Sequence, residues 1–186
     1  MIQSAKENKK KREAIKIEHE LKKLQEVYPQ ITDDSLIFDF HILIYHMLEF
    51  LGRELEALEE LNNTLKICSH ASQRGFILRE IGLTYMRMNQ QEKGFEYLNA
   101  YYTETEANKI YNEMTDASLW LARFYYAKQD YKQSMKYSNN AIYASKKENN
   151  LFAIHCLKSN YMEWQQLIFA AIQMLTLSFR TSAMTL

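Results

Sequence analysis

The stretch LREIGLTYMRMNQQEKGFEYL, residues 78–98, has the pattern of two amphipathic helices joined by a short polar break. Asn89 lies in the break, whereas Gly82 and Gly94 lie inside the two helical segments. Glycine weakens a helix, so its position here indicates that another backbone comes close. The stretch therefore predicts a helical hairpin with contact points at Gly82 and Gly94 and a turn at Asn89.

The same spacing recurs along the chain, which is how a repeat architecture shows itself in a sequence. Forty residues later, Ala122 and Ser134 stand where Gly82 and Gly94 do, and a similar pattern lies 37 residues earlier. The predicted hairpins cover residues 35–68, 73–106 and 109–147, with a partial unit over 151–166.

The composition favours helices throughout. The 186 residues include one proline and four glycines, too few for the turns of a many-stranded sheet. The predicted fold is all-α, a right-handed superhelical array of antiparallel helical hairpins, or α-solenoid. The repeat domain is expected over residues 31–166, after an N-terminal region over 1–30 and before a C-terminal region over 167–186.

The segments IGLTYMRMNQQEKGFEYL and LARFYYAKQDYKQSMKYSNNAI resemble the tetratricopeptide repeat family, in particular the long-repeat variety of bacterial signalling and regulatory proteins. They show its large residue, small residue and Tyr in the first helix, then Gly or Asn at the turn. The chain departs from the family pattern in four ways. No proline closes a repeat, Tyr45 replaces a small residue, Ser138 replaces a large one, and the periods of 37 and 40 exceed the usual value of about 34.

Both ends of the chain differ from the repeats. Residues 1–30 form a predicted basic amphipathic helix with eight Lys or Arg against four Glu in residues 1–23, ended by Pro29. The run LIFAAIQMLTLSF, residues 167–179, is apolar but shorter than the roughly 20 residues of a membrane span. It is interpreted as a terminal helix that covers the last hairpin, with burial in a homo-oligomer or truncation of a longer chain as equal explanations for its apolar surface.

No motif for catalysis is present. The glycines form no phosphate-binding loop, and His41 and His46, five residues apart, lie on different helix faces. Cys68 and His70 lack two further metal ligands at suitable spacing, and Cys68 and Cys156 are interpreted as reduced, buried thiols. The sequence therefore predicts a protein that is not an enzyme, with no catalytic residue, metal site or cofactor.

The family resemblance implies that the first helix of each hairpin lines a peptide-binding groove. Transfer by register places apolar and aromatic side chains, a histidine and two arginines there. The guanidinium groups of the two arginines, Arg79 and Arg123, could converge on one carboxylate. For each one, packing or a local ion pair is the alternative, and for Arg79 the alternative partners are Glu80, Glu49 and Asp116. The predicted groove residues are Ile42, His46, Phe76, Arg79, Leu83, Met86, Trp120, Arg123 and Tyr126.

The leading functional hypothesis is a cytoplasmic scaffold that binds a protein or short peptide. Two alternatives stay open: a regulatory module of a bacterial peptide-responsive signalling system without its output domain, and an assembly subunit that oligomerises through residues 167–186. Equal numbers of basic and acidic residues, 23 of each, argue against nucleic acid and anionic membranes as partners.

Overall fold

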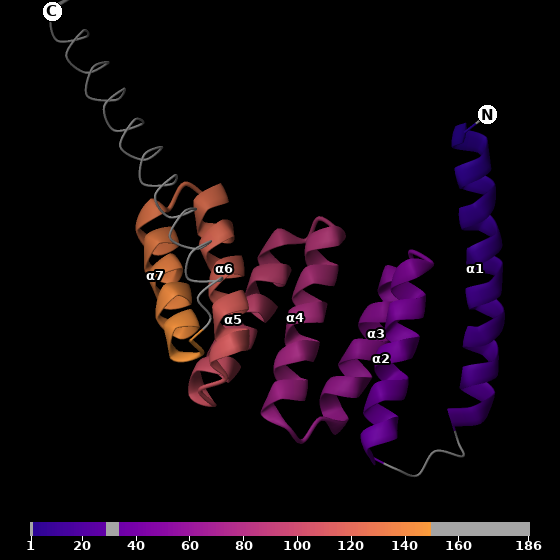
Figure 1. The fold of residues 1–186 in the computed structure, drawn as a ribbon, viewed down its shortest axis with the longest axis horizontal. Coiled ribbons are helices and arrows are strands. Elements are labelled where there is room, and N and C mark those ends of the chain that lie inside the picture. Colours follow the sequence, from indigo (N-terminus) through magenta and orange to yellow (C-terminus); the bar gives the residue numbers. More distant parts are fainter. Residues whose placement is uncertain (1, 29–33, 150–186) are drawn as a thin grey trace, which may run out of the picture. The chain divides into compact units, whose positions relative to one another are not determined.

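The computed structural model describes residues 2–28 and 34–149, and these are helical almost throughout (Figure 1). The helices are α1 (Ile2–Val27), α2 (Asp34–Phe50), α3 (Glu54–Ile67), α4 (Ala71–Arg87), α5 (Gln91–Ala107), α6 (Tyr111–Ala127) and α7 (Tyr131–Lys147). The all-α prediction is confirmed, and the helices begin and end within a few residues of the predicted positions. The predicted fourth unit and the region 167–186 lie outside the described residues.

Tight turns with a left-handed residue end most of the helices. Gly52 has φ +70°, and Asn89, Lys109 and Gln129 have φ between 56° and 60°. At the Asn89 turn, the Asn89 amide donates to the Met86 carbonyl and the Gln90 amide to the Tyr85 carbonyl, which together form a Schellman motif. The same pair of hydrogen bonds recurs at the other three positions. The turn predicted at Asn89 is therefore confirmed.

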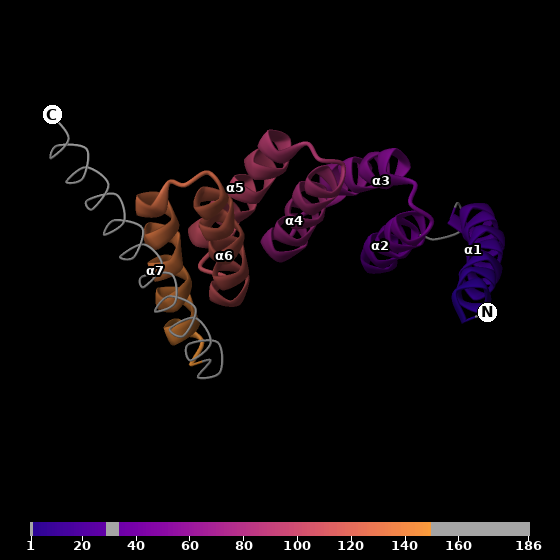
Figure 2. The ribbon, with the colours of Figure 1, turned by 90° about the horizontal axis from the view of Figure 1, so that it is seen from above.

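By its internal contacts the chain divides into two units, Met1–Tyr97 and Leu98–Leu186, with the boundary inside α5. In the first unit, α2 and α4 lie on the same side of α3 (Figure 2). Buried side chains of α2, α3 and α4 form one core there, which includes Tyr45, Leu61 and Ile81. The predicted apolar side of α1 joins it, because Leu21 is buried in the same core and Leu24 packs against it.

The helices α4 and α5 come close to each other at Gly82 and Gly94. A Cβ built on Gly94 would lie 2.9 Å from the Gly82 carbonyl oxygen and 2.9 Å from the Met86 Cγ atom. The predicted contact between Gly82 and Gly94 is therefore confirmed.

The equivalent contact in the second unit is a hydrogen bond. The Ser134 hydroxyl, on α7, donates to the Ala122 carbonyl oxygen, on α6, at 2.9 Å. Tyr137 of α7 packs edge-on against Tyr102 of α5, with ring centroids 5.4 Å apart. The Asn140 amide donates to the Tyr102 hydroxyl at 2.9 Å. A small-residue contact between α6 and α7 and several tyrosine contacts, among them Tyr102 with Tyr137, thus hold the helices of the second unit together.

Candidate functional site

Two of the predicted groove residues line a common pocket in the first unit. Ile42 of α2 and Phe76 of α4 line a space of about 300 Å³ together with Phe38, Ser72 and Gln73. Both helices are first helices of their hairpins, which is why the repeat register placed these two side chains on one surface. The walls are apolar, and a hydroxyl and an amide supply the polar groups, as is usual for pockets that bind peptides or small ligands.

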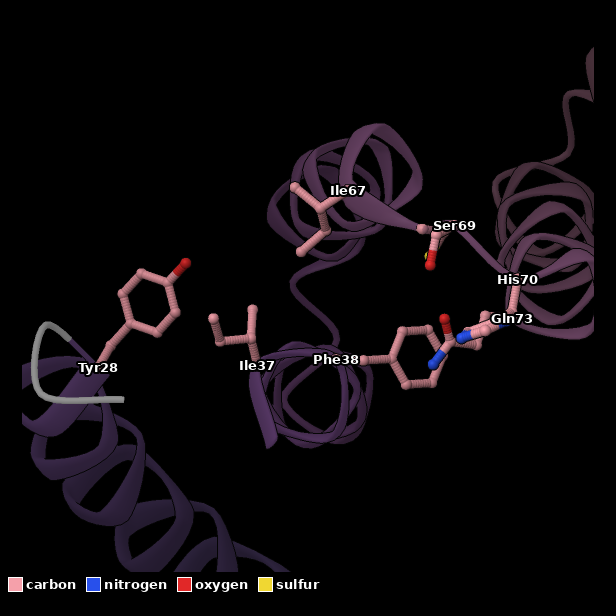
Figure 3. A pocket seen from close by; sticks show the side chains of 8 residues that line it. Tyr28, Ile37, Phe38, Ile67, Ser69, His70 and Gln73 are labelled. Atoms are coloured by element: carbon pink, nitrogen blue, oxygen red, sulfur yellow. The ribbon is translucent and has the colours of Figure 1, made fainter. Parts of the chain in front are cut away.

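A larger pocket of about 540 Å³ adjoins the first and shares Phe38 and Gln73 with it. It lies among the end of α1, the start of α2, the end of α3 and the start of α4 (Figure 3). In Figure 3 the Phe38 ring points toward Gln73. Its lining consists of Tyr28, Ile37, Phe38, Ile67, Cys68, Ser69, His70 and Gln73.

No sequence pattern predicts this second pocket, because most of its walls come from helix ends and from the connection between α3 and α4. Cys68 is a free, buried thiol at its edge, and burial raises the pKa of that thiol. A raised pKa keeps the thiol protonated and unreactive near neutral pH. Its burial and lack of a disulfide agree with the expected inert cysteine.

A hydrogen-bonded network lies directly beside the smaller pocket. The Tyr45 hydroxyl donates to Glu80 at 2.7 Å, and Arg79 donates to the same carboxylate through Nε at 2.9 Å and Nη2 at 2.7 Å. The Arg79 guanidinium also lies over the Phe76 ring, 5.1 Å from its centroid. Of the three alternative partners predicted for Arg79, the structure therefore shows Glu80. Arg79 connects the network to the aromatic wall of the pocket.

Arg87 extends the charged surface toward the C-terminal ends of α2 and α4. Its guanidinium forms an ion pair with Glu49 at 3.0 Å and donates to the Thr84 hydroxyl at 2.8 Å. His46 is exposed and hydrogen-bonded to Glu49 at 3.3 Å. The surface formed by α2 and α4, called the α2–α4 face below, is thus apolar at its N-terminal end and ionic at its C-terminal end.

The other two predicted residues of α4 are half-buried. Leu83 lies on the same helix as Phe76 and Arg79. Met86 packs toward α5, because its Cγ and Sδ atoms are the ones that a Cβ on Gly94 would meet. Met86 therefore contributes to the packing of the hairpin.

The predicted residues of α6 lie in the second unit. The Arg123 guanidinium lies over the Trp120 ring, 5.2 Å from its centroid, and the Tyr126 ring packs edge-on against Tyr131 of α7 at 5.7 Å. Arg79 belongs to the first unit and Arg123 to the second. The convergence of the two side chains on one carboxylate therefore stays a prediction.

Other clusters of polar side chains form local contacts. His41 of α2 is hydrogen-bonded through Nδ1 to Glu60 of α3 and through Nε2 to the Tyr28 hydroxyl at 3.2 Å. Among the described residues, no group of three or more His, Cys, Asp or Glu side chains could hold a metal ion. None of the helices described is both long and apolar enough to cross a membrane.

Comparison with known proteins identifies a fold and no family. No protein-family model matches the chain, and no curated protein matches it by sequence. Aspartyl phosphate phosphatase F from Bacillus subtilis is structurally similar, with a TM-score of 0.64 and 17% identity over 80% of this chain and 42% of that chain. BtubC (BKLC) from P. vanneervenii gives a TM-score of 0.50 and 12% identity, covering 81% and 75% of the two chains.

These similarities support the helical fold alone. The chain spans less than half the length of the phosphatase. At such low identity, no activity and no binding residue can be transferred to this protein.

Proposed function

We propose that this chain is a non-enzymatic scaffold that binds a protein segment or a short peptide on the α2–α4 face. The observation that carries the proposal is the pocket between Ile42 and Phe76, two residues that the repeat register predicts on one surface. The tetratricopeptide resemblance supports the same surface, because it implies that first helices line the groove.

The physical form of the site suits an apolar anchor. Aromatic and aliphatic side chains that fill a desolvated pocket supply most of the energy in peptide interfaces. Phe38 and Phe76 provide such walls, while the Gln73 amide can both donate to and accept from a peptide backbone. The ligand expected is therefore a segment with one large apolar side chain for this pocket.

The test begins with a random peptide library displayed on phage and selected on the purified protein. Peptides that bind are then titrated against the Ile42→Glu variant. We expect the dissociation constant to rise by about tenfold or more, because a carboxylate is then placed in an apolar pocket. Leu55→Glu is the matched control, since Leu55 of α3 is 72% exposed and lines neither pocket.

Equal affinity of the wild type and the Ile42→Glu variant would remove the pocket from the binding site. Circular dichroism melting of both variants separates a loss of binding from a loss of folding.

The arginine pair is a separate part of the proposal. If Arg79 and Arg123 both contact the ligand, the double variant Arg79→Ala/Arg123→Ala binds at least about tenfold more weakly. Unchanged affinity would assign Arg79 to the network with Glu80 and Arg123 to the stack on Trp120.

A regulatory module in a peptide-responsive system is the second candidate, because the fold also resembles part of a larger phosphatase. In such a module, the peptide alters the affinity for another protein. A scaffold binds its peptide without that coupling. Titration of a candidate protein partner with and without the selected peptide separates the two functions.

A further inference from the structure

The exposed side of α7 carries a regular row of positive charge. Lys132, Lys136 and Lys146 are exposed on α7, and Asn139 and Tyr143 lie between them. These five residues, called the α7 outer face, fall on one side of the helix within an arc of about 80° and along about 21 Å. The helix from Tyr131 to Lys147 contains no Asp or Glu.

The same positions of α5 carry the opposite charge. Glu92, Glu96 and Glu106 are exposed on α5, with Asn99 and Thr103 between them. We call these five residues the α5 outer face. Each stands 40 residues before its counterpart, so Glu92 corresponds to Lys132, Glu96 to Lys136 and Glu106 to Lys146. The two faces therefore have the same spacing along their helices and opposite charges.

We propose that the α7 outer face binds the α5 outer face of a second copy of this chain. Matching rows of carboxylates and ammonium groups attract each other and set the register of the contact. Within the described residues, the lysines of the α7 outer face make no ion pair, and the Lys136 ammonium lies over the Tyr137 ring, 5.2 Å from its centroid. In that part of the chain, no carboxylate neutralises the positive charge of the row.

Each copy carries both faces, so one copy can offer its α7 outer face to the α5 outer face of another copy. The charged side chains of both faces are exposed, and exposed ion pairs are individually weak and screened by salt. The resulting association is weak at physiological ionic strength and stronger at low salt.

Other anionic partners fit the α7 outer face less well. A nucleic acid is longer than the row of lysines, which extends about 21 Å along the helix. It would also approach the negative charge of Glu106, because Glu106 accepts a hydrogen bond from Tyr102, which in turn accepts one from Asn140 of α7. An anionic membrane requires apolar side chains that insert, and Tyr143 is the single large apolar side chain among the five residues. A complementary protein surface of limited length fits both the charge and the extent.

The test is a charge exchange followed by sedimentation velocity. One variant, Lys132→Glu/Lys136→Glu, has two acidic faces, and the other, Glu92→Lys/Glu96→Lys, has two basic faces. We expect the wild type to associate at about 20 mM salt and to dissociate at about 0.5 M salt. Each variant alone should associate at least about tenfold more weakly. An equimolar mixture of the two should regain the association of the wild type.

Lys16→Glu/Lys22→Glu is the control, because it makes the same change in charge at exposed positions of α1. It should leave the association intact. Circular dichroism establishes that every variant is folded.

Three results would overturn the proposal. They are a wild type that stays monomeric at low salt, an association that the lysine reversal leaves unchanged, and a mixture of folded variants that does not associate. Binding of duplex DNA or of phosphatidylserine vesicles by a monomeric wild type, lost in the lysine variant, would assign the α7 outer face to an anionic partner instead. None of these results bears on the pocket between Ile42 and Phe76.

Discussion

Among single residues, Gly94 is a position where an added methyl group meets a backbone atom. Its substitution by alanine should lower the free energy of unfolding by about 1–3 kcal/mol through overpacking, although alanine favours a helix by about 1 kcal/mol. The reason is the Gly82 carbonyl oxygen, 2.9 Å from the new Cβ, which belongs to a helix and cannot move alone. Urea denaturation of Gly94→Ala measures the change.

A second variant separates the two obstacles at this position. Met86 is flexible and can move aside, so Gly94→Ala combined with Met86→Ala removes the side chain but not the carbonyl. The double variant is compared with Met86→Ala alone. If Gly94→Ala causes no loss of stability in that background, the Met86 side chain and not the backbone is the obstacle.

Tyr45 is a buried side chain whose hydroxyl donates a hydrogen bond to a carboxylate. It is fully buried and donates to Glu80 at 2.7 Å. Hydrogen bonds to charged groups contribute about 1.5–3 kcal/mol, so Tyr45→Phe should lower the unfolding free energy by about that amount. Tyr143→Phe is the control, because Tyr143 is 51% exposed. An equal effect of the two substitutions, measured by urea denaturation, would contradict the role of this hydrogen bond.

The same residue shows what register alone could not predict. Tyr45 departs from the small residue of the repeat pattern, and its hydroxyl reaches Glu80 on the next first helix. Arg79 had three candidate carboxylates within reach of its sequence position. The ion pair with Glu80 depends on side-chain geometry, as does the contact of Arg79 with the Phe76 ring, and periodicity does not encode side-chain geometry.

At the scale of elements, the left-handed residues that end the helices store strain. Lys109 and Gln129 adopt φ of 56° and 60°, a region that costs a residue with a Cβ about 1–2 kcal/mol. Gln129→Gly should therefore raise the unfolding free energy by about 0.5–1 kcal/mol, since part of the relief is offset by the greater freedom of glycine when unfolded. Asn89→Gly should gain less, because Asn tolerates this conformation.

The measurement is the midpoint of urea denaturation for each variant. Gln133→Gly is the control, since Gln133 lies within the first turn of α7. A glycine inside a helix destabilises by about 1 kcal/mol. A loss of stability in Gln129→Gly would show that the side chain at this turn contributes more than the strain costs.

The helices were largely predictable, because the helical spacing of apolar residues and the positions of turn-forming residues indicated the same helix ends. Gly52 and Asn89 marked two helix ends, and both have positive φ in the structure. The turns at Lys109 and Gln129 use residues without a glycine signal, so only the helical periods on either side identified them. The large pocket was not predictable, because the positions of helix ends depend on how neighbouring helices pack.

At the scale of the whole molecule, buried tyrosines make the stability sensitive to alkaline pH. Burial raises the pKa of Tyr45 and Tyr97 in the first unit, and of Tyr102 and Tyr137 in the second, from the ordinary value of 10.0. Between the ordinary pKa and the raised one, the folded chain holds protons that the unfolded chain has lost. The stabilisation is therefore complete below about pH 10 and is lost as the pH rises above it.

We expect the unfolding free energy, measured by urea denaturation, to stay level with respect to these groups up to about pH 10 and then to fall. Tyr102→Phe removes one of the four groups, so the unfolding free energy of this variant should fall less steeply over the same pH range. The variant should start from a lower unfolding free energy, because the hydrogen bonds of the Tyr102 hydroxyl to Glu106 and Asn140 are lost. Tyrosinate absorbance recorded in parallel should rise together with unfolding. A rise in absorbance of the folded chain at about pH 10, with no loss of stability, would mean that these hydroxyls ionise in place and that burial does not protect them.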